Sequence, residues 1–435
     1  MKHFTRHIFI IGLCFSLFFN FAKAYPQSTA HQETLQADSI HGSYTFSLLT
    51  CGPGSESYTL YGHTAIRIVN EVAGEDFVIN YGIFSFNQPH FMLRFLLGKP
   101  DYRVEAVPFA YFIQEYQLEH RWVKEQVLQL TNTEKETLMK AIANNLRPEN
   151  STYRYNIFTA NCTTKAADII ESSLQHPLHA PSPAQSTYRS EVHKYLKSHP
   201  WNRFGVDLLL GVNADRILPQ DKQVFLPEHL SDYFGAAKTE YEENTDKSDA
   251  QESTLTPFVS ATNMLNPPTE SAGSNETPLT TVCSPRNLLS FIALLVIVLS
   301  FCGYRRKRFF VPFDIAIASI LGIAGCALLF MAFSEHPTVS LNTHILLLNP
   351  LYLFCICPLI GISRRNKSAM VNPDEYRQSK PVRIFLCGVI VLCAPLFILS
   401  SLIQQHADGT LLLSVALFIR YYFLLFRQAS PAASR

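Results

Sequence analysis

The stretches GHTAIRI at Gly62–Ile68 and NCTTKAADII at Asn161–Ile170 decide how this chain folds and where its chemistry lies. The first alternates between two faces, which predicts a strand with His63 at its start. The second opens with a good N-cap and continues with apolar residues at helical spacing, which predicts a helix with Cys162 in its first turn. A helix N-terminus favours a thiolate, and a thiolate beside an imidazole is a nucleophile paired with its base.

Both residues also have a plain structural interpretation. A free cysteine is most often a small buried hydrophobic residue, and Cys51 offers a disulfide partner for Cys162. The polar neighbours of Cys162 favour an exposed turn instead. A lone histidine at a strand end is most often structural, but with Cys162 in the same domain we interpret His63 as the general base.

A third group should orient the imidazole. Asn80 lies on the next predicted strand, and antiparallel pairing would place it beside His63, although Glu56 and Tyr58 compete for this role. The oxyanion of an acyl-transfer step would be held by the backbone N–H of Cys162 and one side-chain donor. For that substrate contact the candidates are Tyr58 and Asn161.

Composition excludes several other classes of protein. The chain has 435 residues, too many for one ordinary domain, and its formal net charge of +1 argues against a dedicated nucleic-acid binder. His90, His120 and His193 show no metal-ligand spacing with one another or with carboxylates. We therefore expect no metal and no soluble cofactor.

Composition also divides the chain into five segments. A basic start, an apolar run and an Ala-Lys-Ala sequence predict a secretory signal peptide, whereas a late stretch rich in Glu, Thr, Ser, Asn and Pro lacks apolar periodicity and predicts a disordered linker. The predicted segments are a signal peptide at 1–24, a polar leader at 25–40, a globular domain at 41–235, the linker at 236–285 and a membrane domain at 286–430.

The globular segment mixes strand-like and helix-like patterns, which indicates an α+β domain. The strand-like runs are Tyr44–Leu49, His63–Val69, Phe77–Tyr81 and Arg103–Pro108. The helix-like runs are Pro89–Leu97, Ala110–Glu119, Thr133–Asn145, Cys162–Leu174 and Thr187–His199. An aromatic and aliphatic cluster in this segment is either core or a surface for an acyl chain or membrane; its members are Phe84, Phe86, Phe91, Phe95, Leu96 and Leu97.

The last segment predicts an all-α polytopic membrane domain of about five spans. The apolar runs are Leu288–Gly303, Val311–Phe333, Ile345–Ile362, Ile384–Ile403 and Leu411–Phe426. Lysine and arginine occupy the loops after the first and third runs and the tail after the last, and the other two loops have none. The positive-inside rule therefore places the globular domain outside the cytoplasm, in agreement with the signal peptide. In a Gram-negative cell this is a multi-pass inner-membrane protein with a periplasmic domain.

The order of the two motifs carries a resemblance to known enzymes. Ordinary papain-like domains place the cysteine before the histidine, whereas here the His63 strand precedes the Asn161-Cys162 pair. This order resembles the circularly permuted papain-like (NlpC/P60-type) enzymes related to lecithin:retinol acyltransferase. The resemblance implies a permuted papain-like fold for the first domain, and many of those relatives move acyl chains between lipids and acceptors.

The whole layout resembles a Bacteroidota family with a DUF4105-type periplasmic domain followed by membrane helices. The matching motifs are LTCGPG at Leu49–Gly54, GHTAIR at Gly62–Arg67, NYG at Asn80–Gly82 and NCTT at Asn161–Thr164. The family's activity is lipoprotein N-acylation, which implies catalytic roles for Cys162 and His63. It also implies a phospholipid or lipoprotein acyl donor and a diacylated lipoprotein as acceptor.

Two other functions fit the same residues. A periplasmic cysteine peptidase or amidase acting on peptidoglycan would use the same pair with water in place of the amine. A non-catalytic membrane sensor would keep the domain without its chemistry. The extensive membrane domain disfavours the hydrolase, because a peptidase needs only one anchor.

Overall fold

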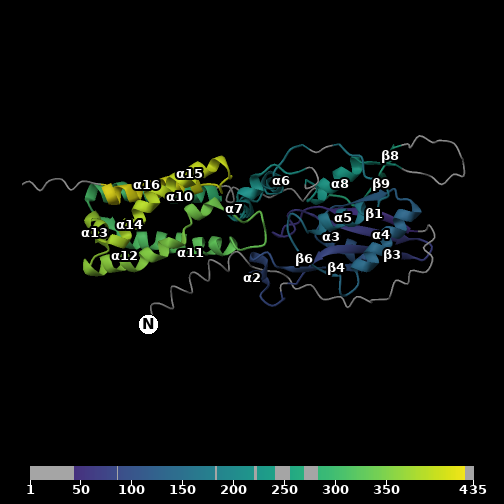
Figure 1. The fold of residues 1–435 in the computed structure, drawn as a ribbon, viewed down its shortest axis with the longest axis horizontal. Helices are drawn as coiled ribbons and strands as arrows, with labels where there is room; N and C mark the ends of the chain where they lie inside the picture. Colours follow the sequence, from purple (N-terminus) through teal and green to yellow (C-terminus); the bar gives the residue numbers. More distant parts are fainter. Residues whose placement is uncertain are drawn as a thin grey trace, which may run out of the picture.

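The computed structural model describes residues 44–85, 87–181, 184–219, 223–240, 255–268 and 283–426. The predicted signal peptide and leader lie outside the described residues, as do residues 241–254 and 269–282 of the predicted linker. A mixed N-terminal domain and a helical C-terminal domain lie end to end along the long axis of the molecule (Figure 1).

The N-terminal domain is built on an antiparallel sheet of seven described strands in the order β6-β4-β3-β2-β1-β5-β9. The first four strands form a meander and coincide with the four predicted strands, which are thereby confirmed. The bounds are β1 (Tyr44–Cys51), β2 (His63–Asn70), β3 (Glu75–Ile83), β4 (Asp101–Pro108), β5 (Val123–Leu128), β6 (Thr152–Arg154) and β9 (Val259–Asn266).

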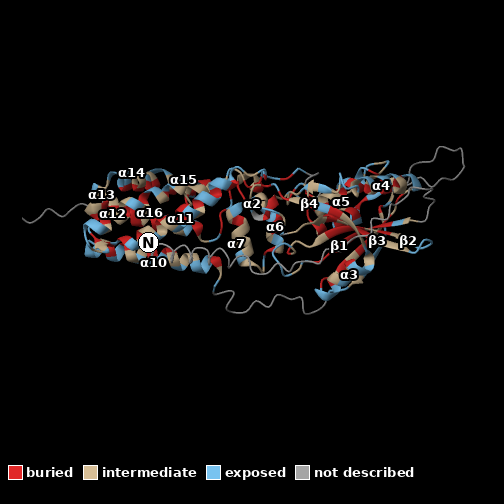
Figure 2. Ribbon diagram, turned by 90° about the horizontal axis from the view of Figure 1, so that it is seen from below, coloured by how far each residue is buried: buried red, intermediate tan, exposed pale blue. Residues whose placement is uncertain are grey.

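Strand alternation gives the sheet two apolar faces of unequal size. The larger core lies between the sheet and three helices, α4 (Asn132–Asn145), α5 (Cys162–Glu171) and α8 (Pro227–Ala236). The smaller core packs against α3 (Phe109–Leu118) on the other face. Figure 2 shows the buried strands between these helices. Because successive residues of a strand point to opposite faces, Thr64 faces α5 while His63 and Ala65 face α3.

The remaining helices of this domain lie on the side of the membrane domain. They are α2 (Phe91–Leu96), α6 (Tyr188–Tyr195), α7 (Pro200–Leu209) and the 3₁₀ turn η1 (Val212–Asp215). Together with α3, α4 and α5, the helices α2 and α6 confirm the five helical predictions, with ends that differ by a few residues.

The predicted linker is wrong in part, because residues 238–240 and 255–266 form strands. Strands β7 (Lys238–Glu240) and β8 (Leu255–Pro257) pair with each other, and β9 pairs with β5 as the edge of the main sheet. The N-terminal domain therefore extends at least to Asn266 rather than to residue 235. Most side chains of β9 are exposed or only partly buried, so this edge strand has no apolar alternation from which it could be predicted.

Four helical segments of the C-terminal domain are long and apolar enough to cross a membrane: Pro285–Arg306, Val311–Met331, Thr343–Arg365 and Lys380–Leu402. The fifth predicted span coincides with α16 (Thr410–Phe426), a shorter apolar helix that packs along α10 (Pro285–Arg306). The other named helices of the domain are α11 (Val311–Met331), α12 (Leu353–Arg365), α13 (Pro373–Gln378), α14 (Lys380–Gly388) and α15 (Ala394–Leu399). Two-residue strands, β10 (Phe309–Phe310) and β11 (Met370–Val371), pair at one end of the bundle.

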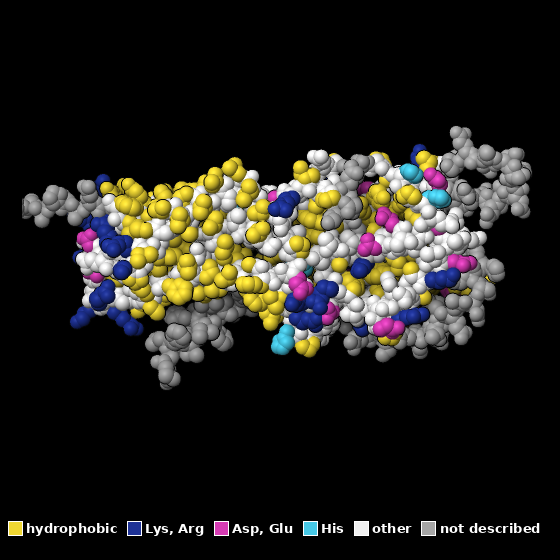
Figure 3. Space-filling view, viewed as in Figure 1, with side chains coloured by type: hydrophobic (Ala, Val, Ile, Leu, Met, Phe, Trp, Pro, Cys, Tyr) yellow, Lys and Arg dark blue, Asp and Glu magenta, His cyan; other side chains and the backbone are white. Residues whose placement is uncertain are grey.

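Charge distinguishes the two ends of this bundle. Figure 3 shows a band of hydrophobic side chains over the helices, with lysine and arginine gathered at the end far from the N-terminal domain. The basic loops at 305–308 and 364–367 account for this end. The opposite end meets the N-terminal domain, so the positive-inside rule and the position of that domain agree.

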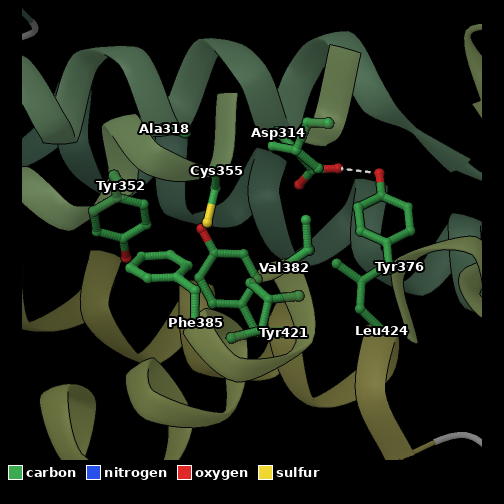
Figure 4. Close-up of a pocket in the computed structure, with 11 residues that line it drawn as sticks. Asp314, Ala318, Tyr352, Cys355, Tyr376, Val382, Phe385, Tyr421 and Leu424 are labelled. Carbon is green, nitrogen blue, oxygen red and sulfur yellow. Dashed lines mark hydrogen bonds between the residues drawn. The ribbon is translucent and has the colours of Figure 1, made fainter. Parts of the chain in front are cut away.

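A buried ion pair and its hydrogen-bond partners join four helices, α10, α11, α13 and α16, near the basic end. The guanidinium of Arg420 on α16 donates to both carboxylate oxygens of Asp314 on α11, at 2.6 and 2.8 Å. The Tyr376 hydroxyl donates to the same carboxylate at 2.6 Å, and Arg420 also reaches Ser300 on α10 at 3.5 Å. Figure 4 shows Asp314 and Tyr376 at one side of a small pocket that is otherwise mostly apolar. Because hydrocarbon offers no other partner, this pair fixes the arrangement of the helices.

The two domains are joined by hydrogen bonds to backbone carbonyl groups. The backbone N–H of Gly211 donates to the carbonyl of Thr338 at 2.8 Å, and the Asn342 amide donates to the carbonyl of Leu208 at 2.7 Å. The backbone N–H of Glu335 donates to the carbonyl of Leu97 at 2.9 Å. The loop that follows α11 is therefore fixed against both α2 and α7, which sets the height of the N-terminal domain above the membrane.

We expect Asp314→Leu to destabilise the protein strongly, by about 3–5 kcal/mol, because it leaves the Arg420 charge buried without a partner. The double variant Asp314→Leu/Arg420→Met should lose less, because no charge is then left unpaired. As a matched control, Asp374→Asn removes a more exposed ion pair with Arg377 and should cost only about 1 kcal/mol or less. Thermal unfolding in detergent measures all three, and equal losses in the single and double variants would contradict this account.

Candidate active site

Cys162 is the first residue of α5, and the turn before it holds the thiol in place. The Asn161 side chain accepts hydrogen bonds from the backbone N–H groups of Thr163 and Thr164, and the Thr164 hydroxyl accepts from the backbone N–H of Asn161. This reciprocal capping box explains why the helix begins at this residue. The helix dipole therefore acts on the Cys162 sulfur, as the sequence predicts.

Asn161 does not have the role predicted for it in substrate binding. Its amide nitrogen donates to the carbonyls of Ile157 at 2.8 Å and Phe225 at 2.9 Å, and its oxygen accepts from the two N–H groups of the cap. The side chain is also buried. Because both amide hydrogens already have partners, Asn161 is a capping residue and has no donor left for an oxyanion.

His63 and Asn80 lie together as predicted. The distance between His63 Nε2 and Asn80 Oδ1 is 2.7 Å. An amide oxygen only accepts, so Nε2 carries the proton and the other ring nitrogen is left to exchange one with the thiol. The Cys162 thiol lies beside the imidazole and each group shifts the pKa of the other, so thiol, imidazole and amide follow one another at the site.

A glycine allows the thiol and the imidazole to meet. Cys162 comes from the helix on one face of the sheet, whereas His63 faces the other, and Gly82 at the end of β3 lies between them. A Cβ on Gly82 would lie 3.7 Å from Cys162 Cβ and 4.0 Å from His63 Cε1. Gly82 has a φ of 96° and sits where the register between β3 and β4 shifts, which is a bulge of the kind that often occurs beside active sites.

The charges of the pair stabilise each other. Burial alone would raise the pKa of Cys162, but the adjacent His63, together with a hydrogen bond from the Thr64 backbone, lowers it below the ordinary thiol value. Burial alone would lower the pKa of His63, but the Cys162 thiolate and Asn80 raise it above the ordinary value. Opposite shifts of this kind favour a thiolate–imidazolium pair around neutral pH.

The alternative of a disulfide between Cys51 and Cys162 is not realised, because both cysteines are free. Cys51 lies directly across from His63 in the pairing of β1 with β2, and its side chain is buried. Burial raises the pKa of Cys51 to about 12, so this thiol stays protonated. The two cysteines thus lie in one neighbourhood with opposite reactivity.

Tyrosines surround the thiol, and Tyr58 lies farther out. Burial, followed by the charge of Cys162, raises the pKa of Tyr102 and Tyr153, so both phenols stay neutral. The Tyr58 ring packs edge-to-face on Phe84 at 5.9 Å between centroids, and 46% of its surface is exposed. The role of Tyr58 in holding an oxyanion stays a prediction, since its contact with Phe84 involves the ring and not the hydroxyl.

Several residues of the site lie outside the predicted set. Gly82 belongs to the quoted NYG motif, yet its role depends on a bulge that sequence spacing does not reveal. The Thr64 hydroxyl lies 3.0 Å from that of Thr163, a buried contact that ties β2 to the first turn of α5. Tyr102 and Tyr153 face each other across β4 and β6, and β6 is too short to give a sequence signal. Among the described residues, no group of three or more His, Cys, Asp or Glu could hold a metal ion.

Two protein-family models match this chain, one over the N-terminal domain and one over the membrane helices. The Lnb N-terminal periplasmic domain matches residues 28–193, which include Cys162, His63 and Asn80, and the Lnb transmembrane domain matches residues 277–430. The chain belongs to the Lnb family. It is a multi-pass membrane protein with a periplasmic N-terminal domain. Among curated proteins and among solved structures, no match was found.

We expect Cys162 to react with iodoacetamide at pH values well below the ordinary thiol pKa, because His63 holds it as a thiolate. Replacing His63 with alanine leaves burial dominant, so the pKa should rise and alkylation at pH 7 should slow at least about tenfold. Peptide-resolved mass spectrometry separates Cys162 from Cys51, which should stay unmodified throughout. Equal rates in wild type and His63→Ala would show that the imidazole does not activate the thiol.

The role of Gly82 can be separated from simple backbone strain. Gly74 also has a positive φ, of 68°, but lies in the turn between β2 and β3 with no atom within 4 Å of an added Cβ. Gly82→Ala and Gly74→Ala should each cost about 1–2 kcal/mol of stability. Only Gly82→Ala should also slow alkylation of Cys162 at pH 7. A matching decrease in both variants would assign the effect to stability alone.

Proposed function

We propose that this protein is an inner-membrane cysteine acyltransferase that moves a fatty acyl chain, through a thioester on Cys162, to the N-terminal amine of diacylated lipoproteins. The hydrogen-bonded Cys162, His63 and Asn80 carry this proposal. Such a constellation recurs in papain-like enzymes, and an antiparallel sheet with the cysteine helix on one face supports a permuted fold of that kind. The membrane helices that follow support a lipid substrate.

The first half-reaction forms the thioester. The Cys162 thiolate attacks the carbonyl carbon of a lipid ester, and the backbone N–H of Cys162 is in position to stabilise the developing oxyanion. The ester bond breaks, and the leaving alkoxide takes the proton that His63 holds. The products are an acyl thioester on Cys162, a free alcohol on the donor and a neutral imidazole.

The second half-reaction forms an amide. The neutral amine of the lipoprotein's terminal cysteine attacks the thioester carbonyl, and the imidazole of His63 receives the amine proton. The carbon–sulfur bond breaks and Cys162 leaves as the thiolate, so the ion pair is restored. Asn80 holds the ring in one orientation through both steps, since its oxygen accepts the same hydrogen bond from the protonated Nε2 throughout.

The placement of the domains supports the inner membrane as the site of action. The N-terminal domain lies at the end of the bundle opposite to the basic loops, where the rule for cytoplasmic loops places the periplasm. Closed barrels, not helical bundles, are usual in outer membranes. Donor and acceptor of the proposed reaction are both anchored in the membrane and meet the enzyme at this surface.

The test is mass spectrometry of the N-terminal peptide of a reporter lipoprotein. We expect an N-acylated peptide from cells with the wild-type protein, and loss of one acyl mass from cells without it or with Cys162→Ala. Cys51→Ala serves as a matched control, because Cys51 is buried and protonated and its removal should keep the acyl mass.

An unchanged peptide in all strains would refute the acyltransferase proposal. Peptidoglycan fragments from the same strains would then test the hydrolase, since a peptidase or amidase should alter stem peptides in a Cys162-dependent way. Retained function in Cys162→Ser by every readout would favour the non-catalytic sensor.

A further inference from the structure

A row of stacked aromatic rings runs away from the Cys162 side of the sheet toward the membrane domain. The ring centroids lie 4.0 Å apart between Tyr155 and Tyr102, 4.7 Å between Tyr102 and Phe84, 5.6 Å between Phe84 and Phe91, and 6.2 Å between Phe91 and Phe95. We call these five residues the aromatic column. Its members come from β4, from α2 and from the segments after β3 and β6, so the fold brings them together from four parts of the chain.

The inner end of the column lies at the thiol. Tyr102 pairs in register with Tyr153 across β4 and β6, and the Tyr153 hydroxyl lies 4.0 Å from the position that a Cβ on Gly82 would take. Cys162 Cβ is 3.7 Å from that same point. Burial raises the pKa of both Tyr102 and Tyr155, and the charge on Cys162 raises it further.

The outer end lies where the two domains meet. Phe95 is on α2, and two residues later the carbonyl of Leu97 accepts a hydrogen bond from the backbone of Glu335. Glu335 follows the last turn of α11 by a few residues, after Phe333, whose side chain is largely exposed. In Figure 3 the hydrophobic band of the bundle continues to this junction, where it meets a group of lysine and arginine side chains. The outer end of the column therefore lies next to the loop that follows α11, beside the ion pair of Lys99 with Glu335 and two residues from the exposed Phe333.

The column is not simply a buried core. Phe91 and Tyr102 are buried, but Phe84, Phe95 and Tyr155 are only partly so. Leu93 on α2 and Tyr58 against Phe84 are each about half exposed, at 47% and 46%. The apolar surface beside the column is thus open to a ligand.

A physical requirement of the proposed function identifies that ligand. Each CH₂ group that is transferred into water adds to the free-energy cost, so a palmitoyl ester could reach a thiol outside the bilayer only at a large cost if its chain were exposed. A continuous apolar path removes most of this cost. Aromatic rings suit such a path, because they offer a large rigid apolar surface at little conformational entropy.

We propose that the aromatic column is the binding site for the fatty acyl chain of the membrane lipid donor, and that it guides the ester from the bilayer to Cys162. This inference rests on the proposed function, since it names where that reaction's substrate chain lies. The ester carbonyl lies at the Tyr102 end, and the chain runs along Phe84 and α2 toward Phe333. The bilayer then holds the distal part of the chain.

The test compares a long and a short acyl ester on the same thiol. Full-length protein in detergent micelles is mixed with p-nitrophenyl palmitate or p-nitrophenyl butyrate, and formation of the Cys162 thioester is followed by intact mass and by release of p-nitrophenolate. The thiolate displaces p-nitrophenolate, which leaves with the electron pair of the ester bond. We expect Phe84→Ala to lower the ratio of palmitate to butyrate rates about tenfold, because one ring contact is lost from the path of the long chain.

A matched control is available on β3, the strand that precedes Phe84. Phe77 on β3 is also a partly buried phenylalanine but packs on the main core, so Phe77→Ala should keep the wild-type ratio. Phe95→Ala, farther out on α2, gives a second test and should lower the ratio even if Phe84→Ala does not fold. An unchanged ratio in Phe84→Ala and Phe95→Ala, or an equal fall in Phe77→Ala, overturns the proposal.

The outcomes also separate this inference from the proposed function. If the palmitate preference depends on Phe84 but reporter lipoproteins are never N-acylated, the chain site stands and the lipoprotein acceptor is wrong. If lipoproteins are N-acylated through Cys162 but the ratio of palmitate to butyrate rates does not change in the Phe84 and Phe95 variants, the acyltransferase proposal stands. The aromatic column then has only a structural role. A further measurement addresses the donor. If the protein releases lysophospholipid from vesicles of phosphatidylethanolamine, the acyl chain comes from a phospholipid.

Discussion

The meeting of a thiol and an imidazole from opposite faces of one sheet is the constraint on which the rest of this structure depends. Side chains on neighbouring positions of a strand cannot reach each other through the sheet, so the contact must be made at its end. Gly82 provides that end, because its bulge and its missing side chain leave room for Cys162 above and His63 beside it. The capping box of α5 and the hydrogen bond to Asn80 then fix the two groups from either side.

A second constraint concerns the height of this site above the membrane. The loop after α11 binds α2 at Glu335 and the segment after α7 at Thr338, so the N-terminal domain is held on two sides rather than by one hinge. Farther in, Gln404 donates to the carbonyl of Leu210 at 3.1 Å, which adds a contact from the last outer loop. The proposed reaction would require the thiol at one depth for both donor and acceptor, and these several contacts hold the N-terminal domain against the helices more firmly than one linker would.

The sequence predicts those parts of the fold in which local pattern and tertiary environment agree. The four central strands and the cysteine helix bury regular apolar faces, so alternation and helical spacing identify them, and antiparallel pairing then places Asn80 beside His63. Strand β9 could not be predicted in this way, since as an edge strand it is held by backbone hydrogen bonds to β5 and its side chains are mostly exposed. The same limit explains why residues 255–266 look like linker.

The site shows a related limit. Asn161 could act either as a helix N-cap or as a hydrogen-bond donor to the substrate. Its tertiary partners, and not its neighbours in sequence, decide between these two roles. As an N-cap it was predictable, but whether its amide hydrogens remained available depended on the carbonyl of Phe225, 64 residues away. Gly82 likewise gains its meaning from Cys162, which the chain brings to it only through the packing of α5 on β2 and β3.

Burial of the site also bears on the choice between acyl transfer and hydrolysis. A thioester is attacked by whichever nucleophile reaches it, and water is present at about 55 M unless the surroundings exclude it. Beyond His63 and Thr163, the charge of Cys162 acts on the phenols of Tyr102, Tyr153 and Tyr155, whose raised pKa values keep them neutral. Their rings offer a rigid apolar surface against which an acyl chain could pack. In the proposed reaction, a lipid-anchored amine is held at the same surface by its own acyl chains and so has the advantage of proximity over water.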